Sequence, residues 1–206
     1  MFSKLAVPLV ISISVTPLIL VLYLKNRRKQ KQVKDTDCIK CIFITARNSD
    51  CRNHLMNNYT CSPSCSMTYL IEILKFLKSA KQTISLCMYM LTLDSVYETL
   101  VEAHNSAINV RVIADSEMSR NTSSKIISLK SKGIPVKMQP LDGSLMHHKF
   151  CLIDETDVLS GKLFFGSTNL TLQGLSSNWD QIIFTNKYSI IKRFSEEFEY
   201  LWQELN

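Results

Sequence analysis

Apolar residues recur along the middle of the chain with the spacings of alternating helices and strands. Residues 66–80 carry them at helical spacing, with Ser66 as the N-cap. The apolar run 83–91 is typical of a buried strand, residues 95–107 of a helix, and 109–115 of a second strand. A strand, a helix and a strand within about 30 residues predict a parallel βαβ unit.

The second half of the chain continues this pattern in shorter segments. The expected helices are 121–132, stopped by Gly133, and an amphipathic closing helix at 188–204. The expected strands are 134–138, 147–153, 157–165 and 181–186. The predicted fold class is therefore α/β, with a mixed β-sheet flanked by helices.

The amino-terminal region has a different character. Leu5 to Leu24 is free of charge over 20 residues, which at helical rise is about the thickness of a bilayer's hydrocarbon core. A transmembrane anchor is therefore expected over residues 1–24. The alternative is a cleaved signal peptide, but no small-residue cleavage site follows and a basic cluster comes next.

The net charge of +6 belongs to this region. Residues 1–34 carry seven basic and no acidic residues, whereas the other 172 carry 17 basic and 18 acidic ones. The basic juxtamembrane linker, 25–37, places the rest of the chain in the cytosol by the positive-inside rule. A net charge of −1 on the remainder argues against a broadly basic, nucleic-acid-coating domain.

One stretch carries a pattern suited to phosphate chemistry. In a strand, His147 and Lys149 share a face, while His148 points to the other side. The lysine can neutralise phosphate oxygens and the histidine can attack phosphorus or move a proton. Downstream, Gly166 allows a close backbone approach, and the segment 167–169 (Ser-Thr-Asn) adds neutral donors.

His-x-Lys-x4-Asp followed by Gly-Ser-x-Asn resembles the HKD motif of the phospholipase D superfamily. The resemblance implies that His147 is a nucleophile forming a phosphohistidine and that Lys149 and Asn169 hold the phosphate. Ser167 would line the phosphate pocket, and Asp154 would be the motif acid with an orienting and structural role. It also implies an α/β fold and no catalytic metal.

The motif departs from the superfamily pattern in one spacing, and one further residue is a candidate member of the site. Eleven residues, 155–165, separate Asp154 from Gly166, where about six are usual in the superfamily. A turn near Ser160 would absorb the excess. Asp180 is a candidate for the downstream acid that orients the histidine in that superfamily.

Phospholipase D chemistry uses two histidines, and this chain has one copy of the motif. His54 and His104 lack a following Lys-x4-Asp, and His148 is expected to face away from His147. The second His147 must then come from another chain, so a homodimer is expected.

A group of cysteines gives a second signal. Cys51, His54, Cys61 and Cys65 follow the spacing Cys-x2-His-x6-Cys-x3-Cys, which suits a structural zinc ion. The pair Cys38-x2-Cys41 competes to supply ligands, and free thiols are the alternative. The expected organisation is a zinc element at 38–65 followed by a catalytic domain at 66–206.

The anchor, the atypical cysteine/histidine element and the single HKD motif together resemble the mitochondrial phospholipase D/Zucchini family. The segment 194–202 resembles that family's terminal helix. This resemblance implies a single-pass protein of the mitochondrial outer membrane that faces the cytosol. It implies either cleavage of single-stranded RNA in piRNA maturation or hydrolysis of cardiolipin to phosphatidic acid.

RNA and cardiolipin are both phosphodiesters, so the chemistry of the motif does not distinguish between them. A cationic groove for RNA would draw on Lys125, Lys130, Lys132, Lys137 and Lys162. Cardiolipin would need an apolar entrance near the membrane. The family resemblance favours the endoribonuclease, with the lipase second, and a membrane scaffold that has lost catalysis as a further alternative.

Overall fold

The computed structural model describes residues 19–25, 38–141 and 143–205, in two units, Met1–Asp37 and Cys38–Asn206. Residues 19–25 are helical. The rest of the predicted anchor and almost all of the basic linker lie outside the described residues. Among the described residues, no helix combines the length and apolarity needed to cross a membrane.

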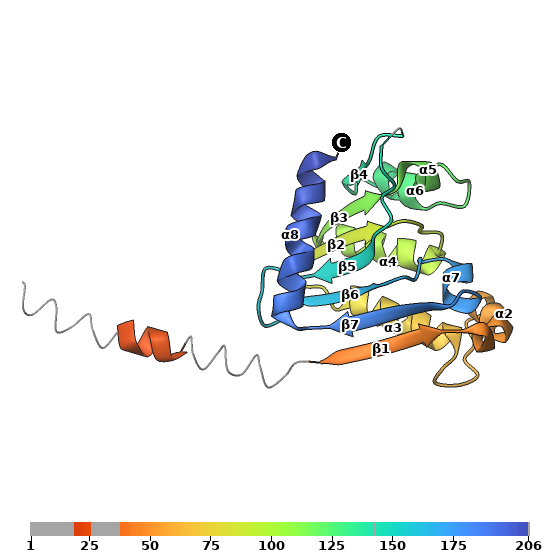
Figure 1. Cartoon of the computed structure of the whole chain (residues 1–206), viewed down its shortest axis with the longest axis horizontal. Helices are drawn as coiled ribbons and strands as arrows, with labels where there is room; N and C mark the ends of the chain where they lie inside the picture. The colour runs from red at the N-terminus through yellow and green to blue at the C-terminus, as the bar shows by residue number, and fades with distance from the viewer. Residues whose placement is uncertain (1–18, 26–37, 142, 206) are drawn as a thin grey trace, which may run out of the picture. The chain divides into compact units, whose positions relative to one another are not determined.

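The second unit is built on one seven-stranded sheet (Figure 1). Its strands are β1 (Ile39–Ile44), β2 (Thr83–Met88), β3 (Asn109–Ala114), β4 (Val136–Met138), β5 (Lys149–Ile153), β6 (Lys162–Gly166) and β7 (Asp180–Thr185). Their spatial order is β1-β7-β6-β5-β2-β3-β4. Strands β2, β3 and β4 run parallel, and the other neighbours are antiparallel. The predicted mixed sheet and its βαβ unit are confirmed.

Helices cover both faces of this sheet (Figure 1). The closing helix α8 (Tyr188–Glu204) lies on one face, against β5 and β6. On the other face lie α3 (Ser66–Lys78), α4 (Asp94–Asn105), α6 (Ile126–Ser131) and α7 (Leu172–Ser176). The remaining short elements are η1 (Ala46–Cys51), α2 (Arg52–Asn57) and α5 (Ser116–Ser119).

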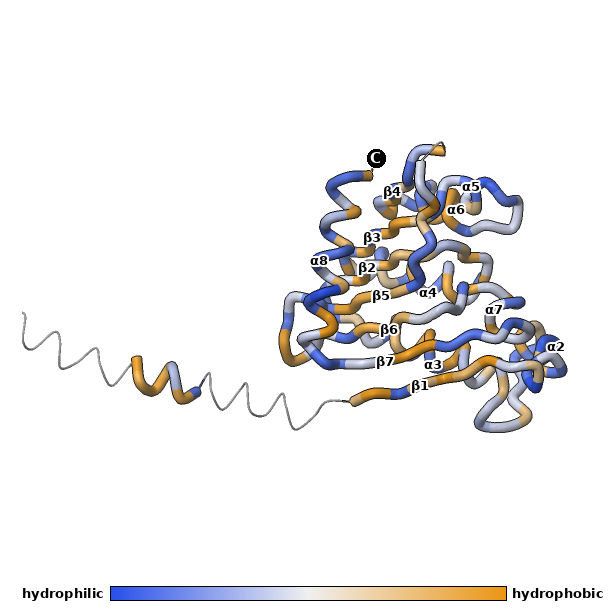
Figure 2. Tube along the Cα trace, viewed as in Figure 1, coloured by the Kyte–Doolittle hydropathy of each residue, from blue (hydrophilic) through white to orange (hydrophobic). Residues whose placement is uncertain are grey.

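Strand β5 separates two hydrophobic cores, and Figure 2 shows apolar residues along the central strands. Its five residues are all buried. Phe150 and Leu152 belong to the core beneath α8, whereas Cys151 and Ile153 belong to the larger core on the other side. This two-sided burial explains why residues 150–153 of β5 form a continuous apolar run in the sequence.

Three predicted elements begin later than expected, two of them because side chains form local turns. The helix expected at 121–132 begins at Ile126, since Asn121 Oδ1 accepts hydrogen bonds from Ser123. The strand expected at 157–165 begins at Lys162, because the Asp157 carboxylate holds a turn. The strand expected at 147–153 begins at Lys149.

The segment 38–65 is continuous with the rest of the second unit. Strand β1 pairs with β7 at the edge of the sheet, and α2 packs on α3 and α7. The expected boundary after Cys65 therefore falls inside one compact unit. Cys65 is the N-cap of α3, and Ser66, predicted to fill that role, is the first helical residue.

Candidate active site

His147 lies two residues before the start of β5, at the edge of the sheet where β2 ends. Met88 is paired with Lys149, and the Tyr89 N–H donates to the His148 carbonyl at 3.0 Å. These bonds fix the backbone on both sides of the motif. The His147 side chain is exposed, whereas Lys149 is only 7% exposed.

The buried Lys149 ammonium points back toward His147. Its Nζ donates to the His147 carbonyl at 2.8 Å and lies 4.8 Å from the centre of the Tyr89 ring. In the described part of the chain, no carboxylate forms an ion pair with it. Burial lowers the pKa of Lys149, and the charge of Asp180 partly opposes that effect. An unpaired ammonium beside an exposed imidazole is suited to binding an anion.

His148 points to the other side of the strand, as the alternation predicts. Its Nε2 lies 3.3 Å from Glu197 of α8, and its ring contacts Phe150. His54 lies in the cysteine cluster, and His104 lies on α4 near Gly133. All four histidines of the chain are described, and none of the other three contacts the His147 ring.

The Gly-Ser-x-Asn segment lies next to Lys149. Strands β5 and β6 are antiparallel, with Phe150 opposite Phe165, so the register continues to place Gly166 opposite Lys149. A Cβ atom on Gly166 would overlap the Gln181 carbonyl oxygen, which explains the glycine.

Asn169 and Ser167 make different contacts. Asn169 Oδ1 accepts from the Met90 N–H at 3.2 Å, and its Nδ2 has no partner among the described residues, so it can donate to a ligand. The Ser167 hydroxyl lies 2.5 Å from Asp180 Oδ1 and accepts from the Gln181 N–H. Ser167 is thus bonded to β7 instead of being free for a phosphate, and it links Asp180 to the site.

Asp154 lies at the opposite end of β5 from His147. Its carboxylate is buried and accepts from three successive backbone N–H groups, those of residues 81–83. Its backbone has a positive φ of 48°. These contacts join the turn after β5 to the start of β2, and they do not reach the imidazole.

The long segment 155–165 does not displace the motif. Ile153 is paired with Lys162, so residues 154–161 form a turn that joins the ends of β5 and β6 farthest from Lys149. The Gly161 N–H donates to the Asp157 carbonyl within this turn. The extra length is accommodated away from the candidate site.

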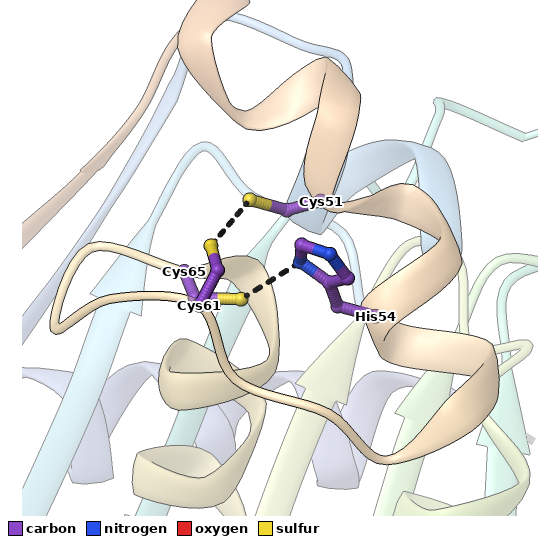
Figure 3. A group of neighbouring side chains, drawn as sticks. All are labelled: Cys51, His54, Cys61 and Cys65. Carbon is purple, nitrogen blue, oxygen red and sulfur yellow. Dashed lines mark hydrogen bonds between the residues drawn. The ribbon is translucent and has the colours of Figure 1, made fainter.

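The four predicted metal ligands lie together in a separate place, between α2 and the start of α3 (Figure 3). The ligand atoms of Cys51, His54, Cys61 and Cys65 lie within 4.8 Å of one another, and this cluster could hold a metal ion. Cys38 and Cys41, the competing pair, are exposed and lie outside the cluster.

The thiols of this cluster differ in their ionisation. Burial raises the pKa of Cys51 to about 11. Burial also acts to raise the pKa of Cys65, but hydrogen bonds from the backbone at Cys61 and Met67 outweigh it and lower the pKa to about 6. Cys65 is therefore a ready thiolate, the form of cysteine that binds metals.

Comparison with known proteins places most of the second unit in one family. Residues 73–202 match the family model "Cardiolipin synthase, PLD-like domain". A Drosophila melanogaster protein named mitochondrial cardiolipin hydrolase is 30% identical over 179 residues, covering 79% of this chain and 70% of that protein. The chain belongs to the mitochondrial phospholipase D/Zucchini family. It is thereby classed as a phosphodiesterase-type hydrolase.

Further relatives with the same name also match this chain. A Chlamydomonas reinhardtii protein of the same name is 29% identical, covering 80% of this chain and 73% of that protein. A Xenopus laevis one is 35% identical, covering 65% of this chain and 60% of that protein. Thus the matched part spans less than two thirds of the frog relative.

Solved structures show the same fold. The phospholipase D family member Nuc from Salmonella typhimurium superposes with a TM-score of 0.62 at 17% identity, covering 82% of this chain and 97% of that one. NucT from Helicobacter pylori gives 0.60 at 17% identity, covering 82% and 98%. The phospholipase D-like fold predicted from the HKD motif is confirmed.

Sequence reasoning missed Tyr89 and the backbone of Met90, which contact His147, Lys149 and Asn169. The one available signal was a tyrosine inside an otherwise aliphatic and sulfur-containing run, 86–91. An aromatic residue with a polar tip at the end of a buried strand is suited to a boundary with solvent.

Proposed function

We propose that the chain is a phospholipase D-type phosphodiesterase in which His147 is the nucleophile. The observation that carries this proposal is an exposed imidazole next to the buried Lys149 ammonium, which has no carboxylate partner among the described residues, with the amide nitrogen of Asn169 nearby. The imidazole nitrogen attacks phosphorus and forms an N–P bond as the bond to the leaving oxygen breaks. Water then hydrolyses the phosphohistidine and regenerates the imidazole.

The leaving oxygen needs a proton, and we propose that His147 of a second copy donates it. The other three histidines of the chain are bonded or packed elsewhere. A two-fold axis through the site would bring the two imidazoles to one phosphorus atom and the two Lys149 side chains beside it.

Cardiolipin is the substrate that the described surface supports best. Of the five lysines considered for an RNA groove, Lys125 pairs with Asp94, Lys137 binds the carbonyls of Trp202 and Leu205, and Lys162 lies at the far end of the sheet. Two exposed leucines of the β4–β5 loop, Leu141 and Leu145, precede His147 instead. Apolar side chains there suit a lipid, and curated relatives are named cardiolipin hydrolases.

Single-stranded RNA is the second candidate. Trp179 is 78% exposed and directly precedes Asp180, which contacts Ser167. An exposed indole next to a phosphate site can stack on a base. Cleavage during piRNA maturation would use this surface and the still exposed Lys130 and Lys132.

The cellular location of the chain and its bound metal are also proposed from its membership of the family. We propose that residues 1–24 anchor the chain in the mitochondrial outer membrane with the second unit in the cytosol. We propose also that the cysteine cluster holds a structural zinc ion. Tetrahedral ligands at zinc bond lengths lie about 3.5–3.8 Å apart. The Cys51–Cys61 sulfurs are 3.7 Å apart, and Cys65 Sγ lies 3.4 Å from His54 Nδ1.

One experiment tests the reaction and ranks the substrates. The full chain and its His147→Ala variant are incubated separately with cardiolipin vesicles and with labelled single-stranded RNA, both without added divalent metal. Release of phosphatidic acid by the wild type alone supports the lipase. Cleavage of RNA alone reverses the ranking, and inactivity on both leaves the membrane scaffold that has lost catalysis.

A further inference from the structure

Tyr89 is the first residue after β2, and its ring touches both key side chains of the motif. The ring centre lies 4.6 Å from that of the His147 imidazole, at an interplanar angle of 60°. The Lys149 Nζ lies over the same ring, 4.8 Å from its centre. One aromatic ring therefore contacts the attacking group and the cation beside it.

The backbone holds this ring firmly. Tyr89 donates its N–H to the His148 carbonyl at 3.0 Å, which extends the ladder in which Met88 faces Lys149. The next residue, Met90, donates its N–H to Asn169 Oδ1. Any movement of Tyr89 would therefore also disturb the main chain of the motif and the side chain of Asn169.

The ring, and not the hydroxyl, makes these contacts. The hydroxyl has no hydrogen-bond partner among the described residues, and burial together with the charges of Asp115 and Glu117 raises the pKa of Tyr89. The group is thus neutral at physiological pH. A neutral aromatic face attracts a cation through its quadrupole.

We propose that Tyr89 is a positioning residue, whose ring holds the His147 imidazole in its attacking orientation and keeps the Lys149 ammonium aimed at the phosphate. This role rests on the proposed nucleophile His147. Lys149 has few other attachments: the His147 carbonyl is its hydrogen-bond acceptor, and Asp180 acts on it only through its charge. Without the ring, both side chains would gain rotamers that do not lead to reaction.

The test compares Tyr89→Phe, which keeps the ring, with Tyr89→Leu, which removes it. Tyr97→Leu is the matched control, because Tyr97 is also half-buried but lies on α4 against the core. The full chain is assayed on bis(4-nitrophenyl) phosphate, a small diester independent of lipid or RNA binding. We expect kcat within about twofold for Tyr89→Phe and about tenfold lower for Tyr89→Leu.

The pH profile separates positioning from a general loss of structure. Without the ring face, the Lys149 ammonium loses a stabilising contact, so the alkaline limb of kcat should move to lower pH in Tyr89→Leu only. Wild-type kcat and profile in Tyr89→Leu would overturn the proposal. An equal loss in Tyr89→Phe would also overturn it, because the hydroxyl would then be the important group.

A second measurement does not depend on activity. The ring should shift the His147 ring-proton resonances upfield in the wild type and in Tyr89→Phe, and this shift should vanish in Tyr89→Leu. If the wild type hydrolysed no diester, the proposed function would fail while this contact was still tested. Unchanged His147 resonances in Tyr89→Leu would refute the contact itself.

Discussion

The Lys149 ammonium donates a hydrogen bond to the carbonyl of His147, 2.8 Å away, so the cation and the proposed nucleophile are tied within one short segment. Lys149 is 7% exposed, and its ammonium has no carboxylate partner among the described residues. A buried charge that lacks a counter-ion costs folding free energy. The geometry that prepares the site for an anion should therefore destabilise the fold.

Lys149→Met should separate activity from stability. Burial lowers the pKa of Lys149 in the folded state, so between that pKa and the ordinary value the unfolded chain binds more protons, and stability rises with pH. Below both pKa values, the buried ammonium is fully charged and its whole free-energy cost to folding is present. The variant should therefore melt at the same or a higher temperature at pH 7, with any gain fading above about pH 10, and lose about a hundredfold or more in kcat.

Lys162→Met is the control for that variant. Lys162 donates to the Ser79 hydroxyl at the far end of the sheet, so its loss should leave kcat unchanged. Thermal melts at pH 7 and pH 10 with diester assays measure both quantities. A lower melting temperature for Lys149→Met at pH 7 would contradict this account of the buried charge.

Mixed dimers should reveal the shared site. If each reaction needs His147 from two copies, a dimer containing one His147→Asn chain cannot complete the cycle. Co-refolding equal amounts of wild type and variant should then leave ~25% of the wild-type activity, the random share of wild-type pairs. Independent monomers would leave about half.

Asp154→Ala should affect folding more than chemistry. The carboxylate accepts three backbone N–H groups, which would be left buried and unpaired, at a cost of about 3 kcal/mol or more. The melting temperature should fall by about 6–12 °C. Below the transition, kcat should stay within about threefold, since catalytic effects need contact with the reacting groups.

Glu98→Ala, an exposed carboxylate on α4, is the control for that variant and should melt like the wild type. Calorimetry and diester assays at low temperature measure the two effects separately. A normal melting temperature combined with lost kcat would instead give Asp154 a catalytic role.

The sequence predicted the βαβ unit and the opposite orientations of His147 and His148 because both depend on local periodicity. It did not predict β1. Four of the six residues of this strand are exposed, one of them is a lysine, and its place in the sheet depends on pairing with β7. Tyr89 and Met90 were missed for a related reason. Their contacts with the motif join residues about 60 to 80 positions apart, and such contacts leave no local pattern.

Removal of the proposed zinc should destabilise the second unit. The cluster joins α2 to the start of α3, and bound metal would add its binding free energy to folding. Chelation or Cys61→Ser should lower the melting temperature, whereas Cys38→Ser, at an exposed cysteine outside the cluster, should not. Elemental analysis should find about one zinc per chain. An unchanged melting temperature on chelation would refute a structural metal.

The leucine before the motif should distinguish lipid from soluble substrates. Leu145 is 57% exposed and lies two residues before His147, so a membrane-bound substrate would bring its side chain into contact with lipid. Leu145→Ser should then lower hydrolysis of cardiolipin vesicles by about tenfold, the effect of losing one buried leucine, and leave hydrolysis of bis(4-nitrophenyl) phosphate unchanged. Leu159→Ser is the control, because Leu159 is 54% exposed in the turn between β5 and β6, at the opposite end of these strands. Equal rates for both variants on vesicles would show that lipid does not enter past Leu145, and would favour RNA as the substrate.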